Sequence, residues 1–132
     1  AGKYAEGVIF SGAPVAQASE KATAFADAYK KAFNMDADDF AKNAYDATNI
    51  LLDGLKAAYD KASDGDKKSL TLDKDAIQAS VAATKDVEGV SGKVTFDGGD
   101  VVKNIAINKV EGGKFVATGE YKVEAGALVK AQ

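Results

Sequence analysis

The sequence predicts an α/β fold class, in which three amphipathic helices are followed by a small set of strands with a C-terminal hairpin. Three observations predict it. Between residues 16 and 87, apolar side chains recur at spacings of three and four, as on one face of a helix. Beyond residue 92, apolar and polar residues alternate, as in half-buried strands. The pair Gly112-Gly113 supplies the positive φ angles that a tight hairpin turn requires.

A short strand is expected first. Gly7-Val8-Ile9-Phe10 is apolar and β-branched, and the turn-forming segment Ser11-Gly12-Ala13-Pro14 follows it. We therefore predict a buried strand over residues 7–10 that leads into a turn or linker.

Two long helices are expected next, over residues 16–33 and 39–61. Asp38 or Asp39 can cap the second one, because either carboxylate can accept hydrogen bonds from amides of the first turn. The apolar face of the first helix is made by Ala18, Ala22, Phe25, Ala26, Tyr29 and Phe33. The second helix carries the strongest apolar stripe of the chain, made by Phe40, Ala44, Ala47, Thr48, Leu51, Leu52, Leu55, Ala58 and Tyr59.

The remaining elements form a third helix and a set of strands. The helix is expected over residues 73–87, after a polar turn over residues 63–66, and Gly89 is placed to end it. Strands are expected over residues 93–97 and 102–110, separated by a turn over residues 97–100. Shorter strands over residues 115–117 and 121–123 then complete a small antiparallel set.

The composition excludes several classes of function. The chain has no Cys and no His, which rules out disulfides, cysteine metal sites and a histidine general base. Its 17 basic side chains are all Lys, so no Arg can bind a carboxylate or phosphate bidentately. A net charge of −3 without basic blocks argues against a nucleic-acid partner and against a polybasic membrane tether. No apolar run is long enough to span a bilayer.

Several segments carry a resemblance to one family. The clearest is Asp39-Phe40-Ala41-Lys42-Asn43-Ala44-Tyr45-Asp46-Ala47, which is similar to an F-x-x-x-x-Y-[DA]-A pattern. The others, in order, are Ala5-Glu6-Gly7-Val8, Ala24-Phe25-Ala26-Asp27-Ala28-Tyr29-Lys30-Lys31-Ala32-Phe33, Asp75-Ala76-Ile77, Val90-Ser91-Gly92-Lys93-Val94-Thr95-Phe96-Asp97-Gly98-Gly99-Asp100 and Gly113-Lys114-Phe115. Together they resemble the type I periplasmic (extracellular) solute-binding proteins of ABC importers, in particular the branched-chain amino acid receptors. Val90 departs from the pattern, which usually has an aromatic residue at that position.

The resemblance implies a two-lobed periplasmic binding protein fold of which this chain is the C-terminal portion. It covers nearly the whole chain, but family members are well over twice as long. It assigns residues 1–12 to a strand of the C-terminal lobe, residues 13–100 to helices and a strand of the N-terminal lobe, and residues 101–132 to a crossover and the C-terminal hairpin. The chain begins with Ala1 rather than Met, which indicates a removed leader or a piece of a longer protein, and the resemblance favours the second.

The function that the resemblance implies is capture of an amino acid or similar small polar solute between the lobes and its delivery to an ABC permease. Such a receptor is exported to the periplasm or the extracellular space. It is not an enzyme, and no cofactor or metal is expected. Without its upstream strands, the chain is expected to pair with the missing N-terminal portion or with itself.

Four residues are candidate solute contacts. The resemblance places Phe40 at the helix end that faces the cleft, although Phe40 is also the first residue of the apolar stripe. Tyr45 can hydrogen-bond a ligand or pack in the core. Lys42 and Asn43 face either the cleft or solvent. No catalytic residue is expected.

Acidic residues elsewhere fit structural roles better. Asp97 and Asp100 lack the alternating oxygen ligands of a calcium loop and are expected in a plain turn. Asp36, Asp38 and Asp39 are expected as solvated charges and helix caps.

An alternative function needs no missing portion. The chain can be a small self-contained α+β interaction module with no catalytic role, in which three amphipathic helices pack on a four-stranded antiparallel sheet. Extension of the source reading frame upstream of Ala1 would favour the receptor.

Overall fold

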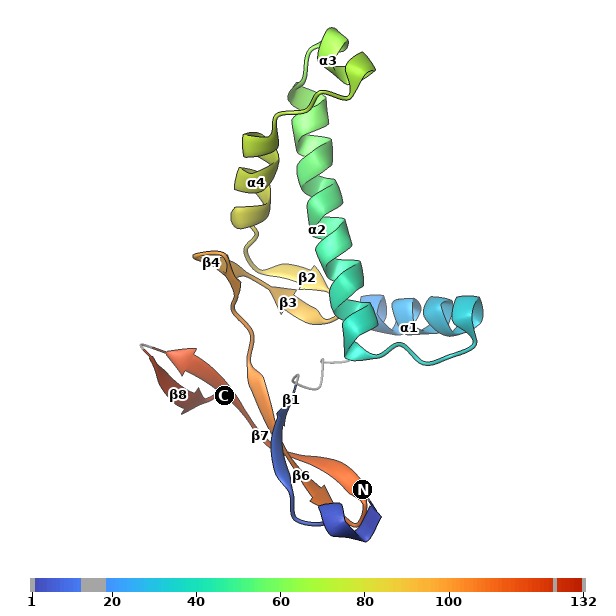
Figure 1. Cartoon of the computed structure of the whole chain (residues 1–132), viewed down its shortest axis with the longest axis vertical. Coiled ribbons are helices and arrows are strands. Elements are labelled where there is room, and N and C mark those ends of the chain that lie inside the picture. Colours follow the sequence, from blue (N-terminus) through green and yellow to red (C-terminus); the bar gives the residue numbers. More distant parts are fainter. Residues whose placement is uncertain (1, 13–18, 125, 132) are drawn as a thin grey trace. The chain divides into compact units, whose positions relative to one another are not determined.

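A computed structural model describes residues 2–12, 19–124 and 126–131 of the chain (Figure 1). The chain divides into two compact units. The first unit consists of Ala1–Gln17 and Lys103–Gln132, and the second consists of Ala18–Val102. The assignment of these segments to the two lobes of a larger receptor stays a prediction. The crossover expected at residues 13–15 lies outside the described residues.

The first unit is a four-stranded antiparallel sheet with the strand order β1-β6-β7-β8. Its strands are β1 (Ile9–Gly12), β6 (Ile105–Glu111), β7 (Lys114–Glu124) and β8 (Ala127–Lys130), and a short 3-10 helix, η1 (Gly2–Ala5), precedes them. Ala106 and Val110 of β6 are its most buried apolar residues, at 0% and 4% exposed. The rings of Phe10 and Phe115 pack edge to face, with centroids 5.0 Å apart.

The expectation of a buried first strand over residues 7–10 was wrong in two respects. The strand begins at Ile9 and continues through Gly12, because its ladder with β6 pairs Ile9 with Lys109 and Gly12 with Ala106. Ile9 is 66% exposed. Within this unit, β1 is an edge strand with β6 as its one described partner, so its side chains lack neighbours on the other edge.

The predicted hairpin between residues 111 and 114 is confirmed. Gly112 and Gly113 have φ angles of 60° and 74°, which only glycine adopts readily. The Glu6 carboxylate accepts hydrogen bonds from both of their amides, at 2.8 Å and 3.2 Å. The turn is therefore held by the backbone preference of glycine and by a side chain from the other end of the chain.

The last strands differ from the expectation of two short segments. β7 runs without a break from Lys114 to Glu124, and β8 was not predicted. Thr118 is accommodated by a bulge, because Ile107 pairs with Gly119 while Asn108 pairs with Ala117. The Thr118 hydroxyl donates a hydrogen bond to the carbonyl of Ile107 at 2.8 Å. Residues 118–120, which lie between the two expected strands, instead belong to β7 and include this irregularity.

The second unit contains the three predicted helices and one more. They are α1 (Glu20–Phe33), α2 (Asp39–Lys61), α3 (Asp64–Ser69) and α4 (Lys74–Ala82). Each begins at a side-chain cap, and the caps are Ser19, Asp38, Ser63 and Asp73. The turn expected at residues 63–66 is thus the start of α3. Among the described residues, none of the helices combines the length and apolar character that crossing a membrane requires.

The third predicted helix ends five residues earlier than expected. α4 stops at Ala82, and Val87 begins strand β2 (Val87–Gly89), which pairs with β3 (Gly92–Val94). Gly89 therefore belongs to a hairpin and does not end a helix. Gly89 lies opposite Gly92, and residues 87–89 pair with residues 92–94. Residues 87–89 could not make this pairing as part of a helix.

The strand expected over residues 93–97 is interrupted at Thr95. The Thr95 hydroxyl accepts a hydrogen bond from the Asp86 amide at 2.9 Å, and its carbonyl accepts one from the Val102 amide at 2.9 Å. Strands β4 (Phe96–Asp97) and β5 (Asp100–Val101) then form a separate small hairpin. The predicted turn at residues 97–100 is confirmed, while the next strand, β6, begins at Ile105 rather than at residue 102.

The face of α2 that packs within the unit shares only Ala58 with the predicted apolar stripe. Its buried residues are Asp46, Ile50, Gly54 and Ala58, at a spacing of four, and α4 packs against it where Gly54 approaches Ile77 and Val81. Most of the predicted stripe is exposed, including Phe40 at 84% and Leu52 at 54%. The spacing of apolar residues along α2 predicted an apolar face correctly. It could not indicate which part of the protein covers that face. The expected pairing with a missing portion or a second copy stays a prediction.

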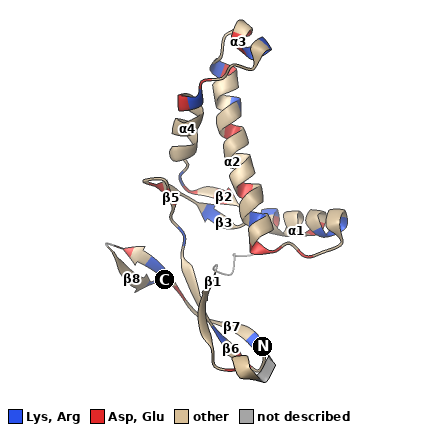
Figure 2. Cartoon of the chain, viewed as in Figure 1, with Lys and Arg blue, Asp and Glu red and all other residues tan. Residues whose placement is uncertain are grey.

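Charges of both signs are distributed along the helices of the second unit. Figure 2 shows Lys residues in blue and acidic residues in red, interspersed along the ribbons of α2 and α3. Ion pairs on α2 join Lys42 to Asp39 at 3.3 Å and Lys56 to Asp60 at 2.6 Å. This mixture matches the absence of a basic block in the sequence.

Candidate functional site

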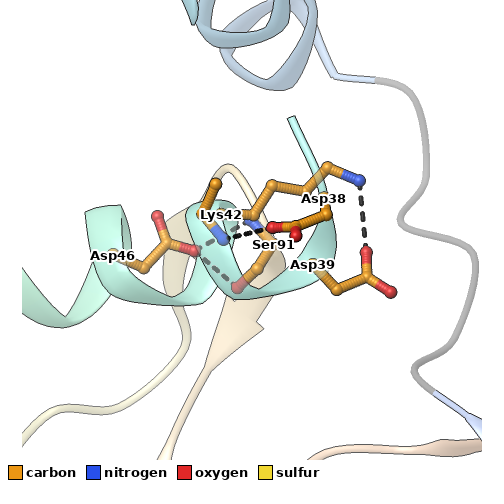
Figure 3. Close-up of polar contacts among 6 residues, drawn as sticks. Asp38, Asp39, Lys42, Asp46 and Ser91 are labelled. Atoms are coloured by element: carbon orange, nitrogen blue, oxygen red, sulfur yellow. Dashed lines mark hydrogen bonds and ion pairs between the residues drawn. The ribbon is translucent and has the colours of Figure 1, made fainter. Parts of the chain in front are cut away.

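The first turns of α2 carry all four candidate solute contacts. Helix α2 starts after Asp38, whose carboxylate accepts a hydrogen bond from the Ala41 amide at 2.8 Å (Figure 3). Asp39 follows as the first helical residue. The helix end therefore presents two carboxylates, and the Ala41 amide, which could have bound an anionic ligand group, is already occupied.

Phe40 is a highly exposed candidate. Its side chain is 84% exposed, on the first turn of α2. Asn43 is also exposed and lies three residues further on, so the two side chains share one side of the helix. An exposed aromatic ring beside an amide suits the recognition of a small solute with both apolar and polar parts.

Tyr45 lies against α1. Its ring is 4.7 Å from that of Phe25, centroid to centroid, and Phe25 in turn contacts Tyr29 at 5.7 Å. Tyr45 also lines an open groove of about 410 Å³, whose other lining residues are Lys21, Ala24, Phe25, Ala28, Tyr29, Ala32 and Phe33. The tyrosine therefore packs two helices of the second unit together.

Lys42 is held close to the helix. Its Nζ lies 3.3 Å from Oδ1 of Asp39, and its side chain is 27% exposed (Figure 3). A helix turns through roughly 100° per residue, so Lys42 and Tyr45 lie roughly 160° and 140° around the axis from Phe40. Phe40 and Asn43 thus lie on one side of α2, while Lys42 and Tyr45, which are also three residues apart, lie on the opposite side.

Asp46 is a residue to which the sequence analysis gave no role. It is 5% exposed, and its Oδ1 accepts a hydrogen bond from the Val90 amide at 2.8 Å. Its Oδ2 accepts two more, from the Ser91 amide at 2.8 Å and from the Ser91 hydroxyl at 2.5 Å (Figure 3). Both carboxylate oxygens therefore bind the turn between β2 and β3.

Gly89 makes room for this carboxylate. A Cβ atom added at Gly89 would lie 2.5 Å from Cγ and 2.7 Å from Oδ1 of Asp46, well inside contact distance. The signal that could have found this site is the position of Asp46 in the series 46, 50, 54, 58, which otherwise holds only Ile, Gly and Ala. A charged residue on a buried face implies partners.

A third contact ties α1 to the same hairpin. The Nζ of Lys21 donates a hydrogen bond to the carbonyl oxygen of Glu88 at 2.7 Å. The Tyr45–Phe25 ring contact joins α1 to α2, and the Asp46 hydrogen bonds join α2 to the hairpin. Each of α1, α2 and the β2–β3 hairpin therefore contacts the other two.

The perturbed ionisable groups lie away from this site. The hydrogen bond between Lys56 and Asp60 raises the pKa of Lys56 and lowers the pKa of Asp60, and their opposite charges act in the same direction. Both side chains are largely exposed, at 73% and 58%, so the pair contributes little to stability. Among the described residues, no group of three or more acidic, His or Cys side chains is placed to hold a metal ion.

The chain matches the model of a protein family. A family model described as "Periplasmic binding protein" matches residues 1–114. A search of curated proteins finds no match.

Several solved structures resemble the chain, and three of them are the following. A leucine binding protein from Thermotoga maritima has a TM-score of 0.67 at 24% identity, covering 90% of this chain and 32% of that one. The branched-chain amino acid transporter substrate binding protein from Streptococcus pneumoniae, in complex with isoleucine, has a TM-score of 0.61 at 28% identity, covering 93% and 30%. An ABC transporter solute binding protein from R. palustris, in complex with benzoate, has a TM-score of 0.62 at 23% identity, covering 90% and 31%. The chain spans about a third of the length of these proteins.

Proposed function

This chain belongs to the periplasmic binding protein family, and from that membership we propose that it is the C-terminal portion of the solute-binding component of an ABC importer. The complete receptor captures an amino acid or similar small polar solute between two lobes and delivers it to a membrane permease. It works outside the cytoplasmic membrane, in the periplasm or the extracellular space. Its role is binding, and it carries out no chemical conversion.

The observation that carries this proposal is the extent of the match. The family model spans residues 1–114, and the Streptococcus pneumoniae protein matches 93% of the chain in fold at 28% identity. That protein is described with isoleucine bound, and the leucine binding protein has the same fold. These neighbours support an amino acid with an apolar side chain as the solute.

Phe40 is the proposed solute contact of this chain. Its ring is exposed on the first turn of α2, where it can cover the apolar part of a solute, and Asn43 beside it can hydrogen-bond a polar part. The carboxylates of Asp38 and Asp39 at the same helix end suit an ammonium group better than a carboxylate. We place Lys42 and Tyr45 at the border of the site, where their contacts with Asp39 and Phe25 support the helix end.

The exposed stripe of α2 favours a part of a receptor over the self-contained module. A self-contained module would have covered this stripe, yet Leu51 and Leu52 remain 48% and 54% exposed. Contiguous exposed apolar surface on a helix is typical of a face that another segment covers.

A panel of solutes tests the proposed function. The complete receptor is heated with leucine, isoleucine, valine, benzoate, glutamate or glucose, and its unfolding temperature is recorded. A ligand present at 100 times its dissociation constant stabilises the folded state by about 2.7 kcal/mol, which is enough to raise that temperature by a few degrees. We expect a rise with at least one branched-chain amino acid and none with glucose. A receptor that no amino acid stabilises would contradict the proposal.

A further inference from the structure

Asp46 is the one buried carboxylate among the described residues, and nothing in the solute contacts proposed above uses it. Both of its oxygens accept hydrogen bonds from the Val90-Ser91 turn, three in all. Hydrogen bonds to an ionised acceptor are shorter and stronger than neutral ones. A buried charge with this many donors holds its partners in a narrow range of positions.

The contact is specific to the residues that surround it. Gly89 and Gly92 flank the turn as a pair of the β2–β3 ladder, and the carboxyl of Asp46 occupies the space that a Cβ on Gly89 would need. The Asp46 carboxylate therefore fits beside the turn because Gly89 has no side chain, and the amides of Val90 and Ser91 donate hydrogen bonds to it.

Asp46 is also the anchor of α2 that lies nearest to Phe40. The buried residues of α2 are Asp46, Ile50, Gly54 and Ala58, so Asp46 is the first of them along the helix. It follows Phe40 by six residues, which is about 9 Å along the helix axis. The position of the first turns of α2 depends on how this residue is held.

We propose that Asp46 is a positioning residue for solute binding, which fixes the N-terminal turns of α2 on the β2–β3 turn and thereby sets the place of Phe40. The inference rests on the proposed function of Phe40 as a solute contact. Asp46 itself touches no solute. The Lys21–Glu88 hydrogen bond braces the same hairpin from α1, so the hairpin is a common support for both helices.

The test replaces Asp46 by asparagine in the complete receptor. The asparagine side chain would keep one acceptor oxygen but present an NH₂ group to donors of the turn. Calorimetric titration with leucine or isoleucine is expected to show about tenfold weaker binding, which corresponds to ~1.4 kcal/mol. A 4-fluorophenylalanine incorporated at position 40 is expected to change its fluorine chemical shift in the solute-free Asp46→Asn receptor.

Two controls separate positioning from general loss of stability. Asp53→Asn makes the same chemical change at an exposed site two turns further along α2, and should alter neither affinity nor fluorine shift. Val110→Ala removes buried volume from the other unit, where Val110 is 4% exposed. It should lower the unfolding temperature without changing the fluorine shift at position 40.

The results of these experiments distinguish the positioning role of Asp46 from solute binding by the receptor. Wild-type affinity and an unchanged fluorine shift in Asp46→Asn would overturn the positioning role. If the wild-type receptor bound no solute, the proposed function would fail, and the fluorine shift would still decide whether Asp46 positions residue 40. If Asp46→Asn did not fold, Ser91→Ala would replace it, because it removes one of the three hydrogen bonds and keeps both amides. An unchanged fluorine shift in that variant would equally overturn the role.

Discussion

Replacing Phe40 by alanine is expected to weaken solute binding by the complete receptor by about 2–4 kcal/mol, the usual effect of truncating an aromatic anchor in a binding pocket. The same change should lower the free energy of unfolding by much less than this, because Phe40 lies outside the buried series of α2, which is Asp46, Ile50, Gly54 and Ala58. Calorimetric titration measures the first quantity and denaturant unfolding measures the second. The large ratio between the two effects distinguishes a solute contact from a core residue.

Phe33→Ala is the matched control for this substitution. Phe33 is also an exposed phenylalanine of the second unit, at 62%, but it ends α1 and contacts Tyr29. Its replacement should leave affinity unchanged. If Phe40→Ala bound solute as tightly as the wild type, Phe40 would belong to the apolar stripe alone and the proposed site would be wrong.

Gly89→Ala is expected to lower the free energy of unfolding by about 3 kcal/mol, since overpacking costs up to that much and the hydrogen bonds of Asp46 would be strained as well. The added Cβ would lie 2.5 Å from the Asp46 Cγ, so the carboxyl must leave the turn or the hairpin must move away from α2. Denaturant unfolding of the receptor, followed by circular dichroism, measures the loss.

Gly65→Ala is the control with the opposite expectation. Gly65 lies inside α3, where an added Cβ would meet only the Ser63 hydroxyl at 3.8 Å. Alanine is favoured over glycine in a helix by about 0.5–1 kcal/mol, so this variant should be as stable as the wild type or more so. Equal stability of Gly89→Ala and Gly65→Ala would show that Asp46 does not occupy the space beside Gly89.

Local signals in the sequence predicted those elements that depend on neighbouring residues. The bounds of α2 were predicted at both ends, because Asp38 caps its start and its apolar period is long. The turn at Gly112-Gly113 was predicted for a similar reason, since positive φ angles leave few residue choices. Family resemblance added the receptor fold, which local patterns could not have indicated.

Elements that depend on distant partners were harder to predict. The end of α4 was misplaced and β2 was not predicted, because the ladder between Val87 and Val94 competes with helix continuation. The packing face of α2 was misjudged because periodicity weighs Leu51 and Leu52 above Gly54, although a small residue is what allows α4 to approach. Asp46 escaped notice because its partners are 44 and 45 residues away in the chain.

The most direct test of the receptor account is a calorimetric titration of the complete receptor, and of the isolated 132-residue chain, with the same branched-chain amino acid. The account predicts one solute bound per receptor and no binding heat from the isolated chain, because a site between two lobes needs both. Binding by the isolated chain with the affinity of the receptor would contradict the account and favour a self-contained module.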